Sequence, residues 1–305
     1  MEIIVGTRGS KLALTQTNWV IEQLKAEHSE HTFTVKIIKT KGDLIQNVPL
    51  DKIGDKGVFV KEIEQQLLGG EIDIAIHSMK DMPSEVTTGL EFVKTPKRED
   101  RRDALVLRGE NICDLSQLRE GAIIATGSKR RKYQLLSVRP DLCIVPIRGN
   151  IDTRIRKIEE ENLDGIVLAA AGLKRLGLEF KIGYYLPEEL MIPAPAQGAL
   201  AIQIRKDDSK IKPIVSRIES MNDEIEIQAE RAFLSGVNGS CNIPIGASAK
   251  VEGCHIGLSG ILGDAEGRKL VRKYIYKTFE TEADARAIGT ELAKLTLKEL
   301  ESHEG

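Results

Sequence analysis

The sequence predicts an α/β protein that ends in a smaller α+β region. Through the first two thirds, short apolar runs typical of strands alternate with stretches whose apolar residues repeat at helical spacing. This alternation is typical of sheets whose strands run parallel. The last third has several consecutive strand-like segments and one long closing helix, which favours an α+β arrangement there.

The first third contains three expected strands and two expected helices. In the first helix, Leu12, Trp19, Val20 and Leu24 share one face. A glycine pair ends the second helix, and the third strand runs directly into the polar segment HSMKD before a proline. The expected strands cover residues 3–5, 33–37 and 72–76, and the expected helices begin near residue 12 and cover residues 58–68.

The second third repeats this order, and the final third changes it. Short strands alternate with a basic helix start at residue 129 and a charged helix over residues 153–161. A proline-containing connector at 187–195 leads into one more strand. The expected strands cover residues 104–107, 122–125, 143–147, 166–170, 198–204, 245–251, 256–261 and 269–276, with helices at 224–234 and 282–301.

Composition sets the class of protein. The chain has 305 residues, of which 41% are hydrophobic and 30% charged, so it has enough length and apolar content for a buried core. A net charge of −2 gives no overall attraction to nucleic acid. We expect a cytoplasmic location, because no apolar run reaches membrane length and the first residues lack the features of a signal peptide. The four cysteines form no CxxC pair and no zinc-ligand spacing, so free thiols and no metal are expected.

Basic residues gather after several expected strands. Residues 129–156 include eight Lys or Arg and only two Asp, an excess of six positive charges (8 − 2 = 6). Ligands of open α/β sheets bind beyond the carboxyl ends of strands, where helix starts favour anions. The pattern therefore predicts a ligand with several negative charges. A solvated helix face balanced by acids elsewhere explains the same run equally well.

Two single residues could carry chemistry. Asp81 is a lone acid at a strand end, where a carboxylate can stabilise a cation or move a proton. An aspartate before a proline-containing loop is also an ordinary turn residue. Cys241 lies in a loop flanked by glycine and proline, where an accessible thiolate could form a covalent bond. A lone cysteine is more often an inert buried residue, and composition does not decide between the two.

Together, these segments resemble the porphobilinogen deaminase family from end to end. The resemblance depends on many matches in the right order, and any one of them alone would be weak. The matching segments are TRGSKLAL (7–14), KGVFVKE (56–62), IHSMKDMP (76–83), RED (98–100), RDA (102–104), RGNIDTR (148–154), AGLKRLG (171–177), AERAF (229–233) and CNIPIG (241–246).

The resemblance implies three domains. Residues 1–96 and 197–216 would form a discontinuous α/β domain that carries the catalytic aspartate, and residues 101–192 a similar α/β domain with a basic cleft face. These two would be similar mixed-sheet domains that resemble the two-lobed solute-binding fold, with hinges near 97–100 and 193–196. Residues 217–305 would form a small α+β domain with the cofactor-bearing cysteine loop.

The family joins four porphobilinogen molecules head to tail, releases ammonia at each step, and finally releases the linear tetrapyrrole hydroxymethylbilane by hydrolysis. Its cofactor is a dipyrromethane held through a thioether, which the resemblance assigns to Cys241. Asp81 would be the catalytic carboxylate, stabilising the azafulvenium cation that forms as ammonia leaves. A carboxylate aimed at a developing cation in a dry site lowers a barrier by roughly 3 kcal/mol.

The resemblance also assigns the remaining site residues. Each pyrrole carries an acetate and a propionate, so the basic cluster gains an anionic ligand. No nucleic acid, membrane or metal is implied, and a monomer is expected, with Arg139 and Arg156 as surface residues. The residues expected to bind the cofactor are Lys80, Asp81, Ser128, Arg130, Arg131 and Arg154. The residues expected to bind the substrate are Arg8, Ser10, Arg148 and Arg175. Lys56, Phe59 and Lys61 are expected to belong to a mobile loop.

Four positions depart from the common pattern of the family: Gly9, Asp55, Gly127 and Ser240. These departures concern loop motion and substrate affinity, not the reaction.

Two alternative functions remain. A non-enzymatic two-lobed binding protein for a small anion would explain the sheets and the basic cleft, but not Asp81 or Cys241. A phosphate-handling transferase would use the same basic helix start, but the chain has no Gly-rich Walker loop.

Overall fold

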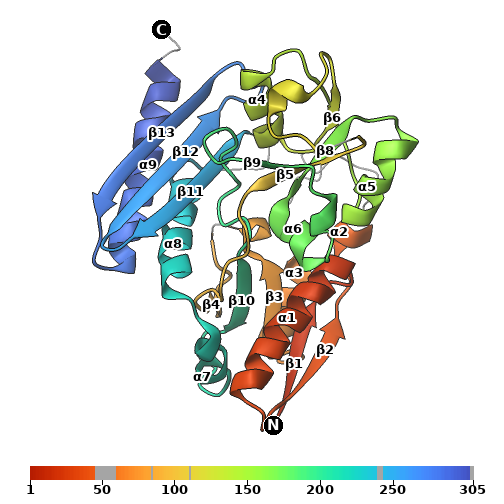
Figure 1. Cartoon of the computed structure of the whole chain (residues 1–305). Coiled ribbons are helices and arrows are strands. Elements are labelled where there is room, and N and C mark those ends of the chain that lie inside the picture. The colour runs from red at the N-terminus through yellow and green to blue at the C-terminus, as the bar shows by residue number, and fades with distance from the viewer. Residues whose placement is uncertain (45–59, 84, 110, 239–242, 303–305) are drawn as a thin grey trace. The chain divides into compact units, whose positions relative to one another are not determined.

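A computed structural model describes residues 1–305 except 45–59, 84, 110, 239–242 and 303–305 (Figure 1). The described residues form two five-stranded sheets and one three-stranded sheet. The predicted class is confirmed: two similar mixed-sheet α/β parts and a small C-terminal α+β part. No helix among the described residues is long and apolar enough to cross a membrane.

The first sheet mixes parallel and antiparallel strands. Strand β1 pairs in parallel with β2 and β3, whereas β10 runs antiparallel to both β3 and β4. The sheet is therefore mixed, as the resemblance implies. The alternation of strands and helices predicts only its parallel pairs, because β10 enters the sheet from a distant part of the chain rather than through a strand-helix-strand crossover. In sheet order the strands are β2 (Thr32–Ile37), β1 (Glu2–Thr7), β3 (Ile74–Ser78), β10 (Leu200–Arg205) and β4 (Leu90–Phe92).

Helix α1 (Lys11–Glu27) contacts β1, β2 and β3 (Figure 1). Its buried residues include Thr17, Val20, Ile21 and Leu24, which follow the i, i+3, i+4, i+7 spacing of one helix face. Trp19 was expected on this face, but its position in the repeat turns it outward and its side chain is 36% exposed. The expected helix is therefore confirmed, with Val20 and Leu24 on its buried face as expected and Trp19 outside that face.

Helix α3 (Lys61–Leu68) contributes to a second core of this part. Ile63 and Leu67 pack against Ile72 and Ala75, and Gly69 caps the helix as expected. The predicted helix at 58–68 begins at Lys61 in the structure, and residues 58 and 59 lie outside the described part. The shorter elements of this part are α2 (Lys41–Leu44), η2 (Met79–Asp81), α7 (Ile211–Val215) and η5 (Ser216–Ile218).

The second sheet repeats the mixed arrangement. Strand β6 pairs in parallel with β7 and β8, and β5 runs antiparallel to β8 and β9. In sheet order the strands are β7 (Cys143–Val145), β6 (Ile123–Ala125), β8 (Gly165–Ala169), β5 (Asp103–Leu107) and β9 (Tyr184–Leu186). The helical elements are η3 (Leu115–Gln117), α4 (Lys129–Val138), α5 (Ile151–Glu160), α6 (Ala170–Arg175) and η4 (Glu179–Lys181).

The C-terminal region is a three-stranded antiparallel sheet with two helices, as predicted. Strands β11 (Ile245–Glu252), β12 (His255–Gly263) and β13 (Leu270–Thr278) pair in that order. Helices α8 (Met221–Gly236) and α9 (Glu282–Ser302) contribute to one apolar core with this sheet (Figure 1).

The chain divides into two compact units, residues 1–99 with 198–224 and residues 100–197 with 225–305. The second sheet and most of the C-terminal region share the second unit. In that unit the amide of Ala247 donates to the Pro193 carbonyl oxygen at 3.0 Å. A Cβ at Gly246 would lie 2.8 Å from the same oxygen, so β11 passes very close to the connector. The three-domain division and its boundaries stay a prediction.

Candidate active site

In the first unit, predicted site residues follow the carboxyl ends of β1 and β3. Strand β1 ends at Thr7, and its parallel register pairs Gly6 with Ala75, so Arg8 falls beside His77. The electrostatic effect of Arg8 on the His77 ring agrees with this register. Parallel pairing thus brings the ends of two strands that are distant in the sequence to one edge of the sheet.

Asp81 is the last residue of the short helix η2. The side chains of Met79 and Met82, on either side of it, are buried, and the Met79 amide donates to the Ala199 carbonyl oxygen at 3.1 Å. Lys80 and Asp81 are exposed. Among the described residues, none donates a hydrogen bond to the Asp81 carboxylate. The backbone is therefore anchored while this carboxylate stays accessible.

A contact with α1 holds the strand end that precedes η2. The Ser78 hydroxyl oxygen lies 3.1 Å from Nε2 and 3.2 Å from Oε1 of Gln16, which is itself buried. The hydroxyl can accept from the amide nitrogen and donate to the amide oxygen. This contact fixes the end of β3 three residues before Asp81.

His77 is buried in β3 and uncharged. Burial, with a smaller contribution from the Arg8 guanidinium, lowers the pKa of His77 to about 4. Its Nε2 atom has no hydrogen-bond partner among the described residues. The side-chain amide of Gln203, on the neighbouring strand β10, donates to the Glu64 carboxylate at 2.7 Å and not to this atom. At neutral pH this ring is therefore a poor proton donor, as expected for a structural histidine.

Two predicted ligand serines cap helices. The Ser10 hydroxyl oxygen accepts from the Ala13 amide at 3.2 Å and begins α1. The Ser128 hydroxyl oxygen accepts from the Arg131 amide at 3.5 Å and begins α4. Each hydroxyl keeps one hydrogen to donate, so capping does not prevent a contact with a carboxylate.

In the second unit, Arg130 and Arg131 share one buried acid that the sequence did not single out. Asp103 begins β5, and the antiparallel register sets it opposite Ala169, at the carboxyl end of β8. Nη1 of Arg130 lies 2.6 Å from Oδ2 of Asp103, and Nη2 of Arg131 lies 2.8 Å from Oδ1. Nε2 of Gln197 donates to Oδ1 at 2.9 Å.

This cluster keeps an excess of positive charge. Two guanidinium groups face one carboxylate, which leaves +1 (2 − 1 = 1), and all three side chains are buried. Burial lowers the pKa of Arg130, and its attraction to Asp103 only partly opposes this effect. The carbonyl oxygens of Ile192 and Val167 each accept from one of the two guanidinium groups, but they carry no net charge, and a buried net charge is costly unless an opposite charge pairs with it. The cluster therefore favours an anionic ligand.

The other predicted arginines of this unit lie near helix ends. Arg148 precedes α5, and Nε of Arg154 donates to the Gly149 carbonyl oxygen at 2.7 Å. Gly149 has φ 114°, and a Cβ there would lie 2.7 Å from the Thr153 side chain. Arg175 is the last residue of α6. All three guanidinium groups belong to half-buried residues.

The rest of the basic run has structural contacts. Nζ of Lys129 donates to the Ala265 carbonyl oxygen at 2.9 Å, and Arg156 pairs with Glu160 on the surface, as expected. Arg139 differs from its expected surface role, because its side chain is 17% exposed and binds Asp141. Its guanidinium also reaches the carbonyl oxygens of residues 115 and 118.

The C-terminal region contributes a second buried charge cluster to this unit. Arg101 contacts Glu226 and Glu230 of α8. The Glu230 carboxylate also accepts from the amides of Ala196 at 2.6 Å and Ala249 at 2.9 Å. These bonds hold α8, which precedes the Cys241 segment, against the connector and β11.

Three predicted residues, Cys241, Lys56 and Phe59, lie outside the described part of the chain. Lys61 is exposed at the start of α3.

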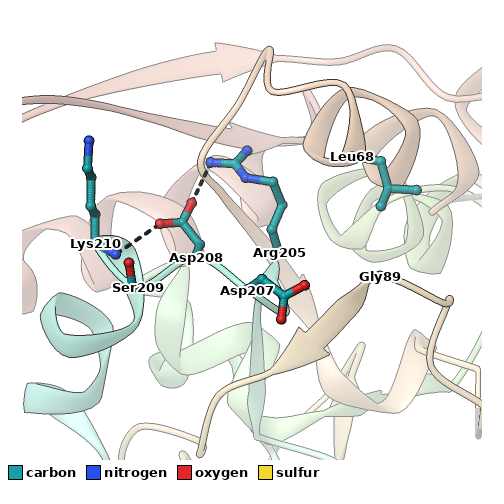
Figure 2. Close-up of a pocket in the computed structure, with 7 residues that line it drawn as sticks. All are labelled: Leu68, Gly89, Arg205, Asp207, Asp208, Ser209 and Lys210. Carbon is teal, nitrogen blue, oxygen red and sulfur yellow. Dashed lines mark hydrogen bonds and ion pairs between the residues drawn. The ribbon is translucent and has the colours of Figure 1, made fainter.

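A pocket in the first unit contains none of the predicted residues (Figure 2). Arg205 lies within it, but its guanidinium already binds Asp208 at 2.6 Å and Asp73 at 3.0 Å. It also donates to the backbone oxygens of Leu67 and Ile72. Figure 2 shows Asp208 between Arg205 and the backbone of Lys210, so the charges of Arg205 and Asp208 are already paired with each other.

Comparison with known proteins decides the family. The model of the dipyrromethane cofactor binding domain of porphobilinogen deaminase matches residues 3–213, and that of its C-terminal domain matches residues 224–298. The chain belongs to the porphobilinogen deaminase family. A porphobilinogen deaminase of Clostridioides difficile (strain 630) is 60% identical over 305 residues, the whole of both chains. One of Clostridium novyi (strain NT) is 55% identical over 98% of this chain and all of the relative.

The family assignment gives the activity. Porphobilinogen deaminases are transferases of tetrapyrrole biosynthesis that make hydroxymethylbilane from porphobilinogen, and this chain has that function. Its larger matched region is the dipyrromethane cofactor binding domain. An arginine-specific periplasmic binding protein of Salmonella typhimurium is also similar, with a TM-score of 0.38 and 13% identity over 71% of this chain and 91% of that one. A likeness this distant carries no information on function.

Proposed function

We propose that Asp81 is the catalytic carboxylate of this porphobilinogen deaminase. The observation that supports it is the accessible acid on η2, whose backbone is anchored by the buried Met79 and Met82. When ammonia leaves the substrate, the electron pair of the breaking C–N bond departs with nitrogen and the pyrrole becomes a cation. A fixed carboxylate stabilises that charge without having to reorganise. The free α-carbon of the growing chain then forms a C–C bond to the cation, and the same carboxylate can accept the proton that this α-carbon loses.

The dipyrromethane is proposed to be held through a thioether on Cys241. When bound, it supplies the pyrrole carbon to which the first porphobilinogen is joined. The described residues fit such a group, because the buried cluster of Arg130, Arg131 and Asp103 keeps one positive charge that an acetate or propionate can pair with. Guanidinium groups bind carboxylates through two parallel hydrogen bonds, which also fixes their orientation.

The other assignments follow from charge and position. Lys80, Ser128 and Arg154 would bind further carboxylates of the cofactor, and the substrate carboxylates would bind the residues at the remaining strand and helix ends. Capping leaves Ser10 and Ser128 a hydrogen to donate. The proposed substrate ligands are Arg8, Ser10, Arg148 and Arg175, and Lys56, Phe59 and Lys61 would belong to a loop that moves during the reaction.

We also propose that the protein is a monomer in the cytoplasm and acts on porphobilinogen without nucleic acid or membrane. The cytoplasmic location is supported by Cys113, Cys143 and Cys254, which are exposed and not paired with one another, as suits a reducing compartment. Sedimentation equilibrium of the purified chain should give the mass of one chain, and a dimer would contradict this part.

One experiment separates the two central roles. The chain is expressed in a host that makes porphobilinogen, and intact mass and turnover are measured for wild type, Asp81→Ala and Cys241→Ala. Wild type should exceed its sequence mass by one dipyrromethane. Asp81→Ala should keep that adduct and lose roughly two to three orders of magnitude in turnover. Cys241→Ala should lack the adduct altogether.

The matched controls are Glu85→Ala, an exposed acid near Asp81, and Cys254→Ser, an exposed thiol. Both should keep the adduct and nearly normal turnover. An adduct lost in Cys254→Ser and retained in Cys241→Ala would refute the attachment site. Normal turnover in Asp81→Ala would remove that residue from its proposed role.

A further inference from the structure

A compact turn joins α1 to β2 in the first unit. His28 is the C-cap of α1, with its amide donating to the Leu24 carbonyl oxygen at 2.8 Å. Glu30 and His31 follow, and β2 begins at Thr32. None of these residues has a part in the proposed chemistry. The turn nevertheless brings two imidazoles and a carboxylate together within four consecutive residues.

Both imidazoles contact the same carboxylate oxygen. Nδ1 of His28 lies 3.3 Å from Oε1 of Glu30, and Nε2 of His31 lies 3.4 Å from the same oxygen. All three potential ligand atoms lie within 4.8 Å of one another. As hydrogen bonds these contacts are long, because typical values are about 2.9 Å. For two ligand atoms at about 2.0–2.1 Å from a tetrahedral Zn²⁺, the separation is about 3.3 Å.

The surroundings also favour a cation. The C-terminal turn of a helix carries a partial negative charge, and α1 ends at this site. The side chains of His28 and His31 are each 18% exposed, so the protein holds both rings, whereas Glu30 is 62% exposed and leaves a path from solvent. The two rings are stacked, with centroids 5.7 Å apart and an angle of 11° between their planes.

We propose that His28, Glu30 and His31 form a binding site for a divalent transition metal, with Zn²⁺ as the best match to two imidazoles and one carboxylate. Water would be the fourth ligand. The metal would link the end of α1 to the start of β2. This site is independent of the catalytic proposal.

Three features limit its affinity. One of the two nearly parallel rings must turn about its Cβ–Cγ bond before both nitrogens can point at one ion. The N-terminal amine of Met1 lies 3.4 Å from Nδ1 of His31 and must lose its proton or move, because metal binding at Nε2 leaves hydrogen on Nδ1. Nε2 of His28 also has no hydrogen-bond partner among the described residues. Such a missing outer partner weakens metal binding by roughly 10- to 100-fold.

The test is a titration of the full-length, cofactor-loaded protein after treatment with a chelator. Zn²⁺ is added in competition with a chromophoric zinc indicator, and Co²⁺ is added separately to report geometry. Wild type should bind one Zn²⁺ and give the intense visible bands of tetrahedral Co²⁺. His28→Ala and His31→Ala should each lose at least 10-fold in affinity and lose those bands. Glu30→Gln should bind more weakly than wild type.

The matched control is the neighbouring pair Cys254 and His255, whose Sγ and Nδ1 atoms lie 3.4 Å apart in the C-terminal region. Cys254→Ser and His255→Gln should leave the stoichiometry and affinity unchanged. Binding that disappears in these controls and persists in His28→Ala would overturn the proposal, as would unchanged affinity in both histidine variants. Turnover serves as the folding control, and it should be normal in every variant of the turn.

Discussion

Asp103 shows how one acid can set the position of two arginines. Each of its oxygens accepts from a different guanidinium, and Gln197 adds a third donor. Burial opposes the charged carboxylate, but attraction to Arg130 and Arg131 outweighs it and holds the pKa of Asp103 far below its usual range. Asp103 is thus a positioning residue in the proposed site, because it acts on the ligand through the arginines.

Asp103→Asn should destabilise the second unit by about 3–5 kcal/mol, because it leaves two buried guanidinium groups without a counter-charge. It should also reduce the fraction of protein that carries dipyrromethane. Urea unfolding and intact mass measure the two effects. Glu160→Gln is the control, since Glu160 pairs with Arg156 on the surface, where an ion pair contributes little to stability. Equal losses in both variants would contradict this account.

His77 should make the first unit sensitive to mild acid. Its folded pKa is about 4 and its unfolded value about 6.5, so between these values the unfolded chain binds more protons. Stability from the neutral ring is complete above pH 6.5 and declines as the pH falls toward 4, by about 3 kcal/mol in total. His77→Gln should lack this loss.

Trp19 provides the measurement, because it is the only tryptophan and lies in α1 of the first unit. Urea midpoints followed by its fluorescence at pH 7 and pH 5 should differ more in wild type than in His77→Gln. His255→Gln, in the second unit, should behave as wild type. The same pH dependence in His77→Gln would show that other groups cause it.

Sequence could predict single residues only where a short motif or a local rule applied. Asp81 belongs to a continuous motif, and serine before a helix is a readable cap at Ser10 and Ser128. Asp103 also lies in a matched segment, yet its partners depend on the β5–β8 register and on a helix almost thirty residues away. Arg139 was misjudged for a related reason, because its carbonyl partners come from a separate loop.

At the scale of elements, three helices begin directly after strands and carry polar caps: α1, α4 and α5. Strand β1 precedes the first, β6 the second and β7 the third. Helix N-termini favour anions, so each of these starts supports the proposed carboxylate binding. The geometry of the α5 start depends on Gly149, whose φ of 114° suits only glycine.

Gly149→Ala should therefore weaken substrate binding as well as stability. An added Cβ would both strain the backbone and collide with Thr153, so α5 and Arg148 must shift. The expected result is a loss of about 2 kcal/mol or more in stability and a raised KM. Gly177→Ala is the control, because Gly177 has φ 68° but open space around it. Equal effects of the two changes would contradict a role for the α5 start.

Most elements could be predicted from apolar spacing, within a few residues at their ends. The direction of each strand could not be predicted from that spacing. The alternation of strands and helices indicates parallel pairs, but β10 pairs antiparallel with β3 and β4, and β5 with β8 and β9. The direction of a strand depends on which distant segment fills its place in the sheet, so only the resemblance implied mixed sheets. The α1 face was also only partly predictable, since Trp19 is apolar but faces outward.

For the whole molecule, the family and its activity could be predicted from the order of motifs along the entire chain. The two matched regions, residues 3–213 and 224–298, cover that same span. The arrangement of the sheets came from that resemblance, since composition alone indicates only α/β followed by α+β. The boundaries of three domains could not be derived in this way, because C-terminal elements pack closely on residues 193–196, where a hinge was expected.

The place of β10 has a consequence for synthesis on the ribosome. It lies between β3 and β4 in the first sheet but is separated from them by more than a hundred residues. Until residue 205 leaves the exit tunnel, β4 has no strand to pair with, and β3 is paired only with β1 on its other edge. Strands β5 to β9, translated in between, can pair without waiting for later sequence. The part of the protein that is made first must therefore be the later of the two sheets to close.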